Sequence, residues 1–235
     1  MVQFDYKNTL IILTRNFMKK NYQIEFDKII QETEKSDVLP TLLLHSCCAP
    51  CSSHVLSLLT SIFSVTVFYY NPNIFPKDEY EHRKNEQLRY IAAVSFDNPV
   101  SVLDCDYESD LFSVFVKGLE SEPEGGARCV KCFELRLEKT ASEAAKSGFS
   151  FFSSTLTVSP HKNAGQINTI GESLQARYGV KWLFSDYKKR DGYRHSVELS
   201  RQYELYRQSY CGCIFSANEL NHLHTTNREA VSNDR

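Results

Sequence analysis

Cysteine is the residue type whose spacing in this chain could support chemistry. Seven of the eight cysteines fall into three short groups, and Cys105 stands apart from them. The groups are Cys47, Cys48 and Cys51 in HSCCAPCSS, Cys129 and Cys132 in RCVKC, and Cys211 and Cys213 in YCGCIF. Close cysteine pairs that lie far from one another along a chain are typical of thiolates gathered on a metal ion or an iron–sulfur cluster.

Two of these groups could supply four thiolates to one site. Cys129 and Cys132 lie three residues apart near the expected start of a helix, which places both thiols on one face at the end that favours thiolates. Cys47 and Cys48 are adjacent, so only a bend of the chain, which the Ala49-Pro50 step favours, lets both reach one ligand. Four thiolates suit a cubane iron–sulfur cluster or a tetrahedral zinc ion, and the spacing does not decide between them. A chance pair on a core-facing helix is the alternative for Cys129 and Cys132.

The third group, Cys211 and Cys213, flanks a single glycine, Gly212. A disulfide between them would close a very small ring, and strained disulfides are easily reduced. We therefore interpret Cys211 and Cys213 as a redox pair, with further metal ligands as the alternative. Cys51 could be a spare cluster ligand, a ligand of a second metal or a core-facing residue. Cys105 is interpreted as a buried structural thiol.

The elements that must position these thiols alternate between strand and helix. Strands are expected over 41–46, 64–70, 100–107, 149–157 and 180–186, and helices over 50–59, 72–94, 128–148 and 164–178. This alternation predicts an α/β fold with a parallel sheet and helices on both faces. Ligands bind beyond the carboxyl ends of the strands in such sheets. Cys47 and Cys48 fall at one of these ends.

The chain is divided by composition into three parts. Residues 1–38 are expected to form a helical N-terminal extension, 39–216 the α/β domain, and 217–235 a polar C-terminal tail. With 27 basic and 29 acidic residues there is no global positive field, so a nucleic-acid partner would need a local basic patch. No apolar run is long enough for a membrane span and no export signal is found, which predicts a cytoplasmic protein with reduced thiols.

Three polar stretches could serve a ligand. The loop 153–163, SSTLTVSPHKN, suits a phosphate or polyol, or is a hydroxyl-rich loop that caps the next helix. The segment 186–210 interleaves cations with tyrosines and could contact single-stranded RNA. The overlapping run 192–216 is expected to be a helix leading into the CGC turn. A charged stripe within 72–94 is expected to be a surface network rather than catalytic. Its members are Glu79, His82, Arg83, Glu86 and Arg89.

Several long motifs in order carry a family resemblance over residues 41–216. They are LHSCCAPCSS, YYNPNIFPKDEYEHR, EGGARCVKCFELRL, FSSTLTVSPHKN and DYKKRDGYRHSVELSRQYELYRQSYCGC. Together they resemble the epoxyqueuosine reductases of the QueH type. The resemblance implies a Rossmann-like, nucleotide α-hydrolase-like fold. It also implies an oxidoreductase that removes the epoxide oxygen of epoxyqueuosine at the wobble position of tRNA with a GUN anticodon, without cobalamin.

The resemblance also implies roles for six of the cysteines. Cys47, Cys48, Cys129 and Cys132 would hold a [4Fe-4S] cluster, and Cys211 with Cys213 would form the redox-active disulfide. A second single metal ion, iron or zinc, and an unidentified electron donor are implied as well.

Two other functions compete with this interpretation. A PP-loop-like iron–sulfur tRNA thiolase would carry a glycine-rich SGGxDS phosphate loop after its first strand, but HSCCAPCSS stands in that place. A zinc-stabilised RNA-binding module would use the same cysteines for structure alone. A brown protein after anaerobic preparation would favour the cluster, and a colourless zinc protein would favour the binding module.

Overall fold

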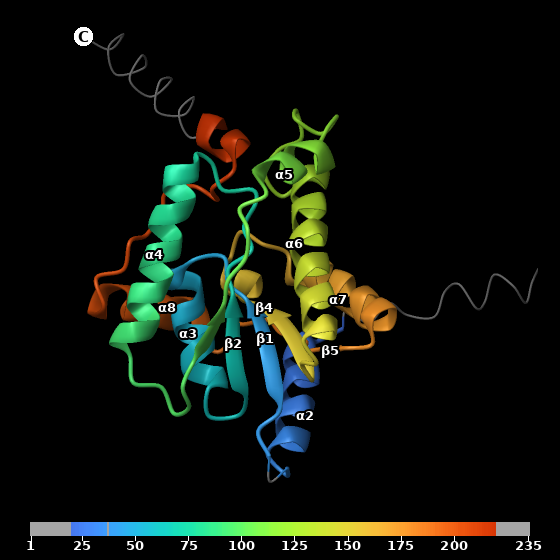
Figure 1. The fold of residues 1–235 in the computed structure, drawn as a ribbon, viewed down its shortest axis with the longest axis vertical. Helices are drawn as coiled ribbons and strands as arrows, with labels where there is room; N and C mark the ends of the chain where they lie inside the picture. The colour runs from blue at the N-terminus through green and yellow to red at the C-terminus, as the bar shows by residue number, and fades with distance from the viewer. Residues whose placement is uncertain (1–19, 37, 220–235) are drawn as a thin grey trace, which may run out of the picture.

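The computed structural model describes residues 20–36 and 38–219, and its centre is a five-stranded parallel sheet (Figure 1). The strands are β1 Thr41–His45, β2 Ser64–Phe68, β3 Ser101–Leu103, β4 Phe151–Ser154 and β5 Lys181–Trp182. Their order across the sheet is β3-β2-β1-β4-β5, and every pair is parallel. The predicted Rossmann-like α/β fold is confirmed. β1, which leads into the first cysteine group, is the central strand.

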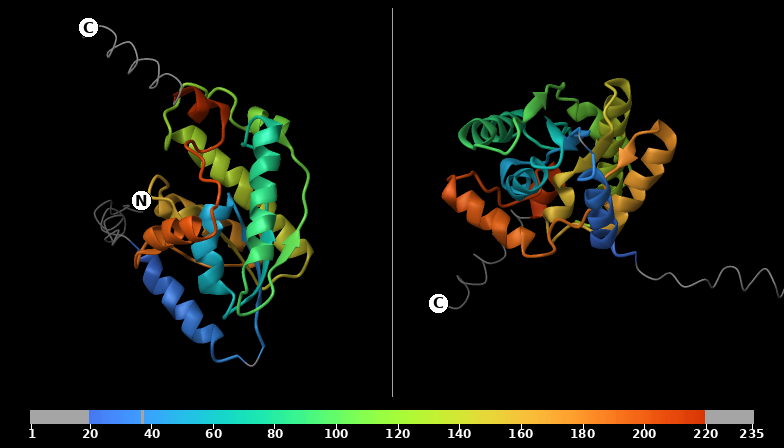
Figure 2. Two further views of the ribbon diagram at one scale, coloured as in Figure 1. Left: turned by 90° about the vertical axis from the view of Figure 1, so that its left-hand side faces the viewer. Right: turned by 90° about the horizontal axis from the view of Figure 1, so that it is seen from below.

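Helices cover both faces of the sheet. They are α2 Tyr22–Thr33, α3 Ala49–Leu59, α4 Lys77–Ala93, α5 Ser109–Phe115, α6 Ala127–Lys146, α7 Ala164–Tyr178 and α8 Gly192–Gln202. Figures 1 and 2 show α3, α4 and α8 on one side and α6 and α7 on the other. Alternating residues of β1 serve the two cores, because Leu42 and Leu44 pack toward α3 and Leu43 packs toward α6 and α7.

Helix boundaries follow local signals in the sequence. Pro50 lies in the first turn of α3. The Asn163 side chain accepts hydrogen bonds from the backbone of Gly165 and Gln166 at the start of α7, and Gly179 ends that helix with φ 73°. These two helices match their predicted ranges to within one residue.

The structure shortens several predicted elements. β3 covers only 101–103 of the predicted 100–107, and β5 covers only 181–182 of 180–186. Both are edge strands with a single pairing partner. The strand predicted for 149–157 ends at Ser154 and continues as a 3-10 turn, η1 Thr155–Val158, while α4 begins at Lys77 rather than at residue 72. The short helix α5 was not predicted.

The prediction that a helix continues to the CGC turn was wrong for the second half of that segment. α8 ends at Gln202, and Glu204 adopts a positive φ of 51°. Leu205 is buried in the core, and the Tyr206 backbone N–H donates to Glu86 Oε1 at 2.7 Å. Because these contacts draw the chain across α4, residues 203–213 form an irregular segment.

The described part of the N-terminal extension is α2, whose Phe26 packs edge-on against Tyr187 at a ring distance of 5.8 Å. The rest of the extension before residue 20, and the C-terminal tail from residue 220, lie outside the described residues, so the predicted domain limits stay predictions. Within 20–36 and 38–219, no helix is both long and apolar enough to cross a membrane.

Candidate active site: thiols around a cavity

The first cysteine group forms a compact triad where β1 turns into α3. The sulfur atoms of Cys47, Cys48 and Cys51 all lie within 4.8 Å of one another, and those of Cys47 and Cys48 are 3.9 Å apart. Cys48 is the fully extended residue that precedes α3, with φ −175°. The chain turns from β1 into α3 between His45 and Ala49, and this is the bend that the Ala49-Pro50 step predicted. Cys51 lies within the first turn of α3 and joins its sulfur to the other two.

Hydrogen bonds decide which thiol of the triad ionises first. Cys48 and Cys51 lower the pKa of Cys47 well below its usual value by hydrogen bonding to its sulfur. Donation to Cys47 in turn raises the pKa of Cys48 to about 12 and raises that of Cys51. The Thr155 hydroxyl donates to Cys47 Sγ at 3.4 Å, and the Gln208 amide donates to Cys48 Sγ at 3.2 Å. The triad therefore stabilises one thiolate, on Cys47.

A buried guanidinium lies between this triad and the second cysteine group. Arg136 of α6 is 2% exposed, and it donates to His45 Nε2 at 3.2 Å, to Asn71 Oδ1 at 2.6 Å and to Cys132 Sγ at 3.9 Å. It pairs with no carboxylate of the described residues. Its charge lowers the pKa of both Cys47 and Cys132, although burial keeps the pKa of Cys132 at about 12. The charge of Arg136 thus favours negative charge on sulfur atoms of both cysteine groups, although burial opposes it at Cys132.

His45, at the end of β1, is held neutral beside this cation. Burial, with the charge of Arg136, lowers the pKa of His45 to about 3. Its Nδ1 lies 2.8 Å from Ser154 Oγ, and Nε2 receives the hydrogen bond from Arg136. Nε2 also lies 3.1 Å from the Tyr70 carbonyl oxygen, so both ring nitrogens of the neutral imidazole have polar neighbours within hydrogen-bond distance.

The second and third cysteine groups line one narrow crevice. Its walls include all four thiols of these groups, Cys129, Cys132, Cys211 and Cys213. Burial raises the pKa of Cys129, whose sulfur accepts a hydrogen bond from Gly125 N at 3.2 Å. The side-chain oxygen of Asn73, also in the wall, is buried without a hydrogen-bond partner in the described chain. Such an orphaned group marks a place suited to a bound species.

The four predicted cluster ligands thus lie in two neighbouring sets. Within the described residues, the group tight enough for a single metal ion is the triad, which includes Cys51 and not Cys129 or Cys132. A cubane cluster holds its ligand sulfurs farther apart than one ion does. Assignment of Cys47, Cys48, Cys129 and Cys132 to a [4Fe-4S] cluster therefore stays a prediction. Cys105 lies outside both sets and packs against the core beside α6, with its pKa raised to about 11 by burial.

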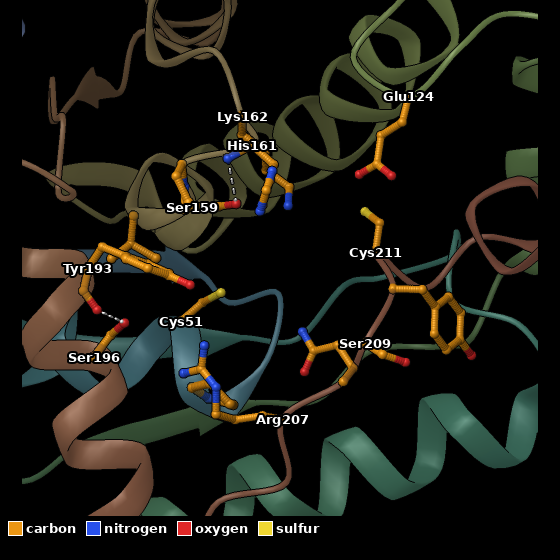
Figure 3. Close-up of a pocket in the computed structure, with 15 residues that line it drawn as sticks. Cys51, Glu124, Ser159, His161, Lys162, Tyr193, Ser196, Arg207, Ser209 and Cys211 are labelled. Atoms are coloured by element: carbon orange, nitrogen blue, oxygen red, sulfur yellow. Dashed lines mark hydrogen bonds between the residues drawn. The ribbon is translucent and has the colours of Figure 1, made fainter. Parts of the chain in front are cut away.

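An open cavity of about 330 Å³ adjoins the crevice. Cys51 and Cys211 lie on its opposite sides, and His161 and Lys162 reach in from the loop after η1 (Figure 3). Burial opposes the charge of Lys162, but the thiols of Cys211, Cys47 and Cys51 raise the pKa of Lys162 above its usual value. Glu124, which leads toward the second cysteine group, lines the wall near Cys211. Thiols from separate parts of the chain therefore meet around one accessible space.

Arg83 corrects the expectation of a surface network on α4. Its side chain is 1% exposed, pairs with Glu79 at 2.6 Å and donates to the Cys211 carbonyl at 3.2 Å. The guanidinium also lies 5.0 Å from the ring centroid of Tyr210. Phe75 N donates to the Gly212 carbonyl at 2.9 Å. The start of α4 and the residue pair just before it therefore hold the CGC turn in place.

The cation-rich and tyrosine-rich segment 186–210 divides between core and cavity. Tyr187 is buried and Tyr203 packs against the same core, so neither is available to RNA. Tyr193, Arg207 and Tyr210 line the cavity.

Sequence reasoning missed two residues that contact the thiols. Arg136 follows Cys132 by four residues, and that helical spacing could have placed it on the same face of α6. Gln208 lies three residues before Cys211, but its contact with Cys48 joins positions 160 apart. No local signal predicts such a contact.

Comparison with known proteins gives a consistent result. A family model described as Epoxyqueuosine reductase QueH matches residues 42–219. Three similar curated proteins carry the same name. One from Streptococcus pyogenes serotype M1 is 45% identical over 206 residues, covering 85% of this chain and 81% of the relative. One from Staphylococcus aureus is 39% identical over 220 residues, covering 90% and 92%, and one from Thermotoga maritima is 39% identical over 190 residues, covering 78% and 94%.

Proposed function

Because the chain belongs to the family of epoxyqueuosine reductases of the QueH type, we propose that it reduces epoxyqueuosine in tRNA to queuosine. The observation that carries the proposal is the cavity with thiols on opposite sides, Cys51 of the triad and Cys211 of the CGC turn. An epoxide in this space would lie between two groups of thiols. The substrate would be a tRNA with a GUN anticodon, and the reaction would take place in the cytoplasm without cobalamin.

The CGC pair can balance this reaction. Removing the epoxide oxygen leaves an alkene and water, and it consumes two electrons and two protons. Oxidation of the Cys211 and Cys213 thiols to one disulfide releases two electrons and two protons. Gly212 between them has φ 124°, a conformation that glycine adopts readily, and this supports a tight turn between the two thiols. An electron donor, not yet identified, would then reduce the disulfide for the next turnover.

The residues present fit a [4Fe-4S] cluster beside this pair. Cys47, Cys48, Cys129 and Cys132 would hold it. In support, one thiol of each pair, Cys47 and Cys132, is influenced by the charge of the buried cation Arg136. A thiolate-bound cluster is anionic, and Arg136 with Lys162 supplies positive charge that no carboxylate of the described residues neutralises. When bound, the cluster supplies electrons one at a time. Cys51, close to Cys47 and Cys48 and open to the cavity, is the candidate ligand of a second ion, iron or zinc.

The test of the reaction is direct. Anaerobically purified protein with a chemical reductant should convert epoxyqueuosine to queuosine in tRNA isolated from cells that lack any such reductase. Nucleoside mass spectrometry of digested tRNA measures both species. Cys211→Ser and Cys213→Ser should each abolish turnover, whereas Cys105→Ser, outside both thiol sets, should retain most of it. A cluster-loaded protein that leaves epoxyqueuosine unchanged would refute the proposal.

The cofactor is tested separately by composition. Anaerobic protein should contain about four iron atoms and four sulfides per chain, the composition of a cubane cluster. Cys132→Ser should lower both contents and the visible absorption, and Cys105→Ser should leave them unchanged. A colourless protein that contains only zinc would instead support the structural RNA-binding alternative. ATP-dependent incorporation of sulfur into tRNA would support the thiolase.

A further inference from the structure

The cavity between Cys51 and Cys211 has the size of a binding site for a small molecule. Its volume of about 330 Å³ falls within the range of about 300–1,000 Å³ found for ligand pockets. It is open to solvent rather than enclosed. A substrate that remains attached to a large tRNA needs such an open approach, because only one nucleotide can enter.

Two cations without a carboxylate partner line the cavity. Lys189 and Arg201 of the segment 186–210 also have no carboxylate partner among the described residues, but they lie outside the cavity lining. Lys188, Arg190 and Arg194 are each paired with a carboxylate, at 2.7 Å, 2.7 Å and 3.4 Å. By contrast, Arg207 and Lys162, which line the cavity, have no carboxylate within ion-pair distance among the residues that the structure covers. Arg207 donates to Ser200 Oγ of α8 at 3.2 Å, which fixes its guanidinium near the wall. Among the described residues that line the cavity, Glu124 alone carries a carboxylate, and it lies on the wall near Cys211. The two cations therefore leave a net positive charge at the cavity, which suits a phosphate.

One tyrosine ring of the segment 186–210 packs against no other ring or cation of the described residues. Tyr187, Tyr203 and Tyr206 each pack against another ring, and Tyr210 packs against Arg83. Tyr193, which is 39% exposed, has no such partner within 20–36 and 38–219. Its side chain projects from α8 along the cavity near Cys51 (Figure 3). Exposed aromatic rings of this kind stack on unpaired bases.

We propose that this cavity binds the wobble nucleotide turned out of the anticodon loop, with its base stacked on Tyr193 and an adjacent phosphate bound by Arg207. The inference rests on the proposed function and names the residues that receive its substrate. Enzymes that modify a base commonly extrude it into a pocket, and loop bases are the least costly to extrude. In this position, the substituent of the modified base extends from Tyr193 into the space between the Cys51 and Cys211 thiols.

The probe is an unmodified RNA of anticodon stem-loop sequence with guanosine at the wobble position. Its affinity for the anaerobic protein is measured by fluorescence anisotropy. Loss of one stacked base weakens binding by about tenfold. Tyr193→Leu should therefore bind the RNA about tenfold more weakly than the wild-type protein. Tyr193→Phe keeps the ring and should bind like the wild-type protein. Arg207→Gln should also weaken binding several-fold.

Arg194→Gln is the matched control, because Arg194 is paired with Asp191 and Glu198 and does not line the cavity. It should leave the affinity unchanged, and all variants should keep the same iron content and visible spectrum. With epoxyqueuosine-containing tRNA, Tyr193→Leu and Arg207→Gln should raise KM far more than they lower kcat.

The outcomes separate this inference from the function on which it rests. If the unmodified chain reduces epoxyqueuosine but Tyr193→Leu and Arg207→Gln behave like Arg194→Gln, the nucleotide site is wrong and the reductase activity stands. If the unmodified chain reduces nothing, the proposed function fails, whatever the RNA affinities are. If both variants lose affinity for a duplex RNA as strongly as for the loop, the cavity does not select an unpaired nucleotide, and the inference is overturned.

Discussion

Arg136 and His45 show how single side chains prepare the site for negative charge. Burying an unpaired charge costs several kcal/mol, and for Arg136 that cost is offset by three neutral hydrogen-bond acceptors, on His45, Asn71 and Cys132. The neutral imidazole of His45 can accept from the guanidinium only because it is not protonated. The pair therefore presents one net positive charge to the thiols.

The stability of the fold should decrease as the pH is lowered, because His45 is buried in its neutral form. The unfolded chain takes up a proton on this residue near its ordinary pKa of 6.5, whereas the folded chain does so only near 3. The unfolded state therefore binds more protons between these values, and folding stability declines as the pH drops through that window. From pH 7 to pH 5, His45 should lower the free energy of unfolding by about 2 kcal/mol.

Urea unfolding of the metal-free protein at pH 7 and pH 5 measures this effect. His45→Gln should be less stable at pH 7 but should lose less stability on acidification than the unmodified chain. Part of the pH dependence should remain, because burial and the nearby His195 also lower the pKa of His54, to about 4. His161→Gln, at an exposed position, is the control. An unchanged difference between the two pH values in His45→Gln would contradict the assignment.

At the scale of single residues, the sequence predicted the grouping of the thiols better than it predicted their partners. The three cysteine groups were visible from their spacing alone. The burial of Arg83 was not, because an arginine in a charged helical stretch usually faces solvent. Its burial depends on the Cys211 carbonyl, 128 positions further along the chain.

Among the structural elements, the CGC turn depends on having no side chain at its centre. A Cβ atom on Gly212 would lie 3.0 Å from Ile74 Cγ1 and 3.1 Å from Arg83 Nη1, at a φ of 124° that other residues rarely adopt. Gly212→Ala should lower the free energy of unfolding by about 1–3 kcal/mol and should shift the thiol–disulfide equilibrium of Cys211 and Cys213 in a glutathione buffer. Thermal unfolding and thiol trapping measure the two effects.

Gly148→Ala is the matched control for this substitution. Gly148 also has a positive φ, of 71°, but a Cβ atom there would meet nothing within 4 Å. It should cost about 1 kcal/mol and leave the redox equilibrium unchanged. Equal effects of the two substitutions on that equilibrium would show that contact with Arg83 does not position the turn.

The junction between α7 and the end of β5 depends on one buried amide. Asn168 donates to the carbonyls of Ala164 and Ser185, both at 2.7 Å, and accepts from Trp182 Nε1 and Ser185 N, both at 3.0 Å. Asn168→Leu leaves these buried groups without partners and should lower the free energy of unfolding by about 3 kcal/mol. Thr169→Ala, on the exposed face of the same helix, should change it by less than about 0.5 kcal/mol. Chemical denaturation compares the two, and equal losses would contradict the role of the amide.

Element prediction succeeded where the signal is local. The side chain of Asn163 caps the start of α7, and the backbone of Gly179 ends the helix with a positive φ. Because both signals are local, the helix was predicted in full. The segment after Gln202 has helical spacing in its sequence, but the contacts of Leu205 and Tyr206 with the core and α4 outweigh that propensity. Edge strands β3 and β5 were overestimated because strand length depends on pairing partners that the sequence does not reveal.

For the whole molecule, the formal charge of −2 limits how RNA can be bound. With no global attraction, we expect affinity for an anticodon loop to come from the two uncompensated cations that line the cavity, Lys162 and Arg207. Two phosphate contacts would give a slope of log affinity against log salt concentration of about −1.4. Titrations of the stem-loop RNA between low and physiological salt measure this slope. A value of −5 or steeper, as for proteins with extended basic surfaces, would mean that most contacts lie outside the cavity.

The positions of the thiols along the chain have a consequence for biosynthesis. The ribosome releases the triad first, then the pair on α6, and only near the end the CGC turn that closes the cavity wall. A nascent or prematurely terminated polypeptide that stops after β5 would possess the sheet and five of the seven grouped sulfurs, yet it would lack the dithiol. If the CGC pair is the electron source that we propose, such a fragment could bind metal but could not reduce a nucleoside, because its reducing thiols had not yet been synthesised.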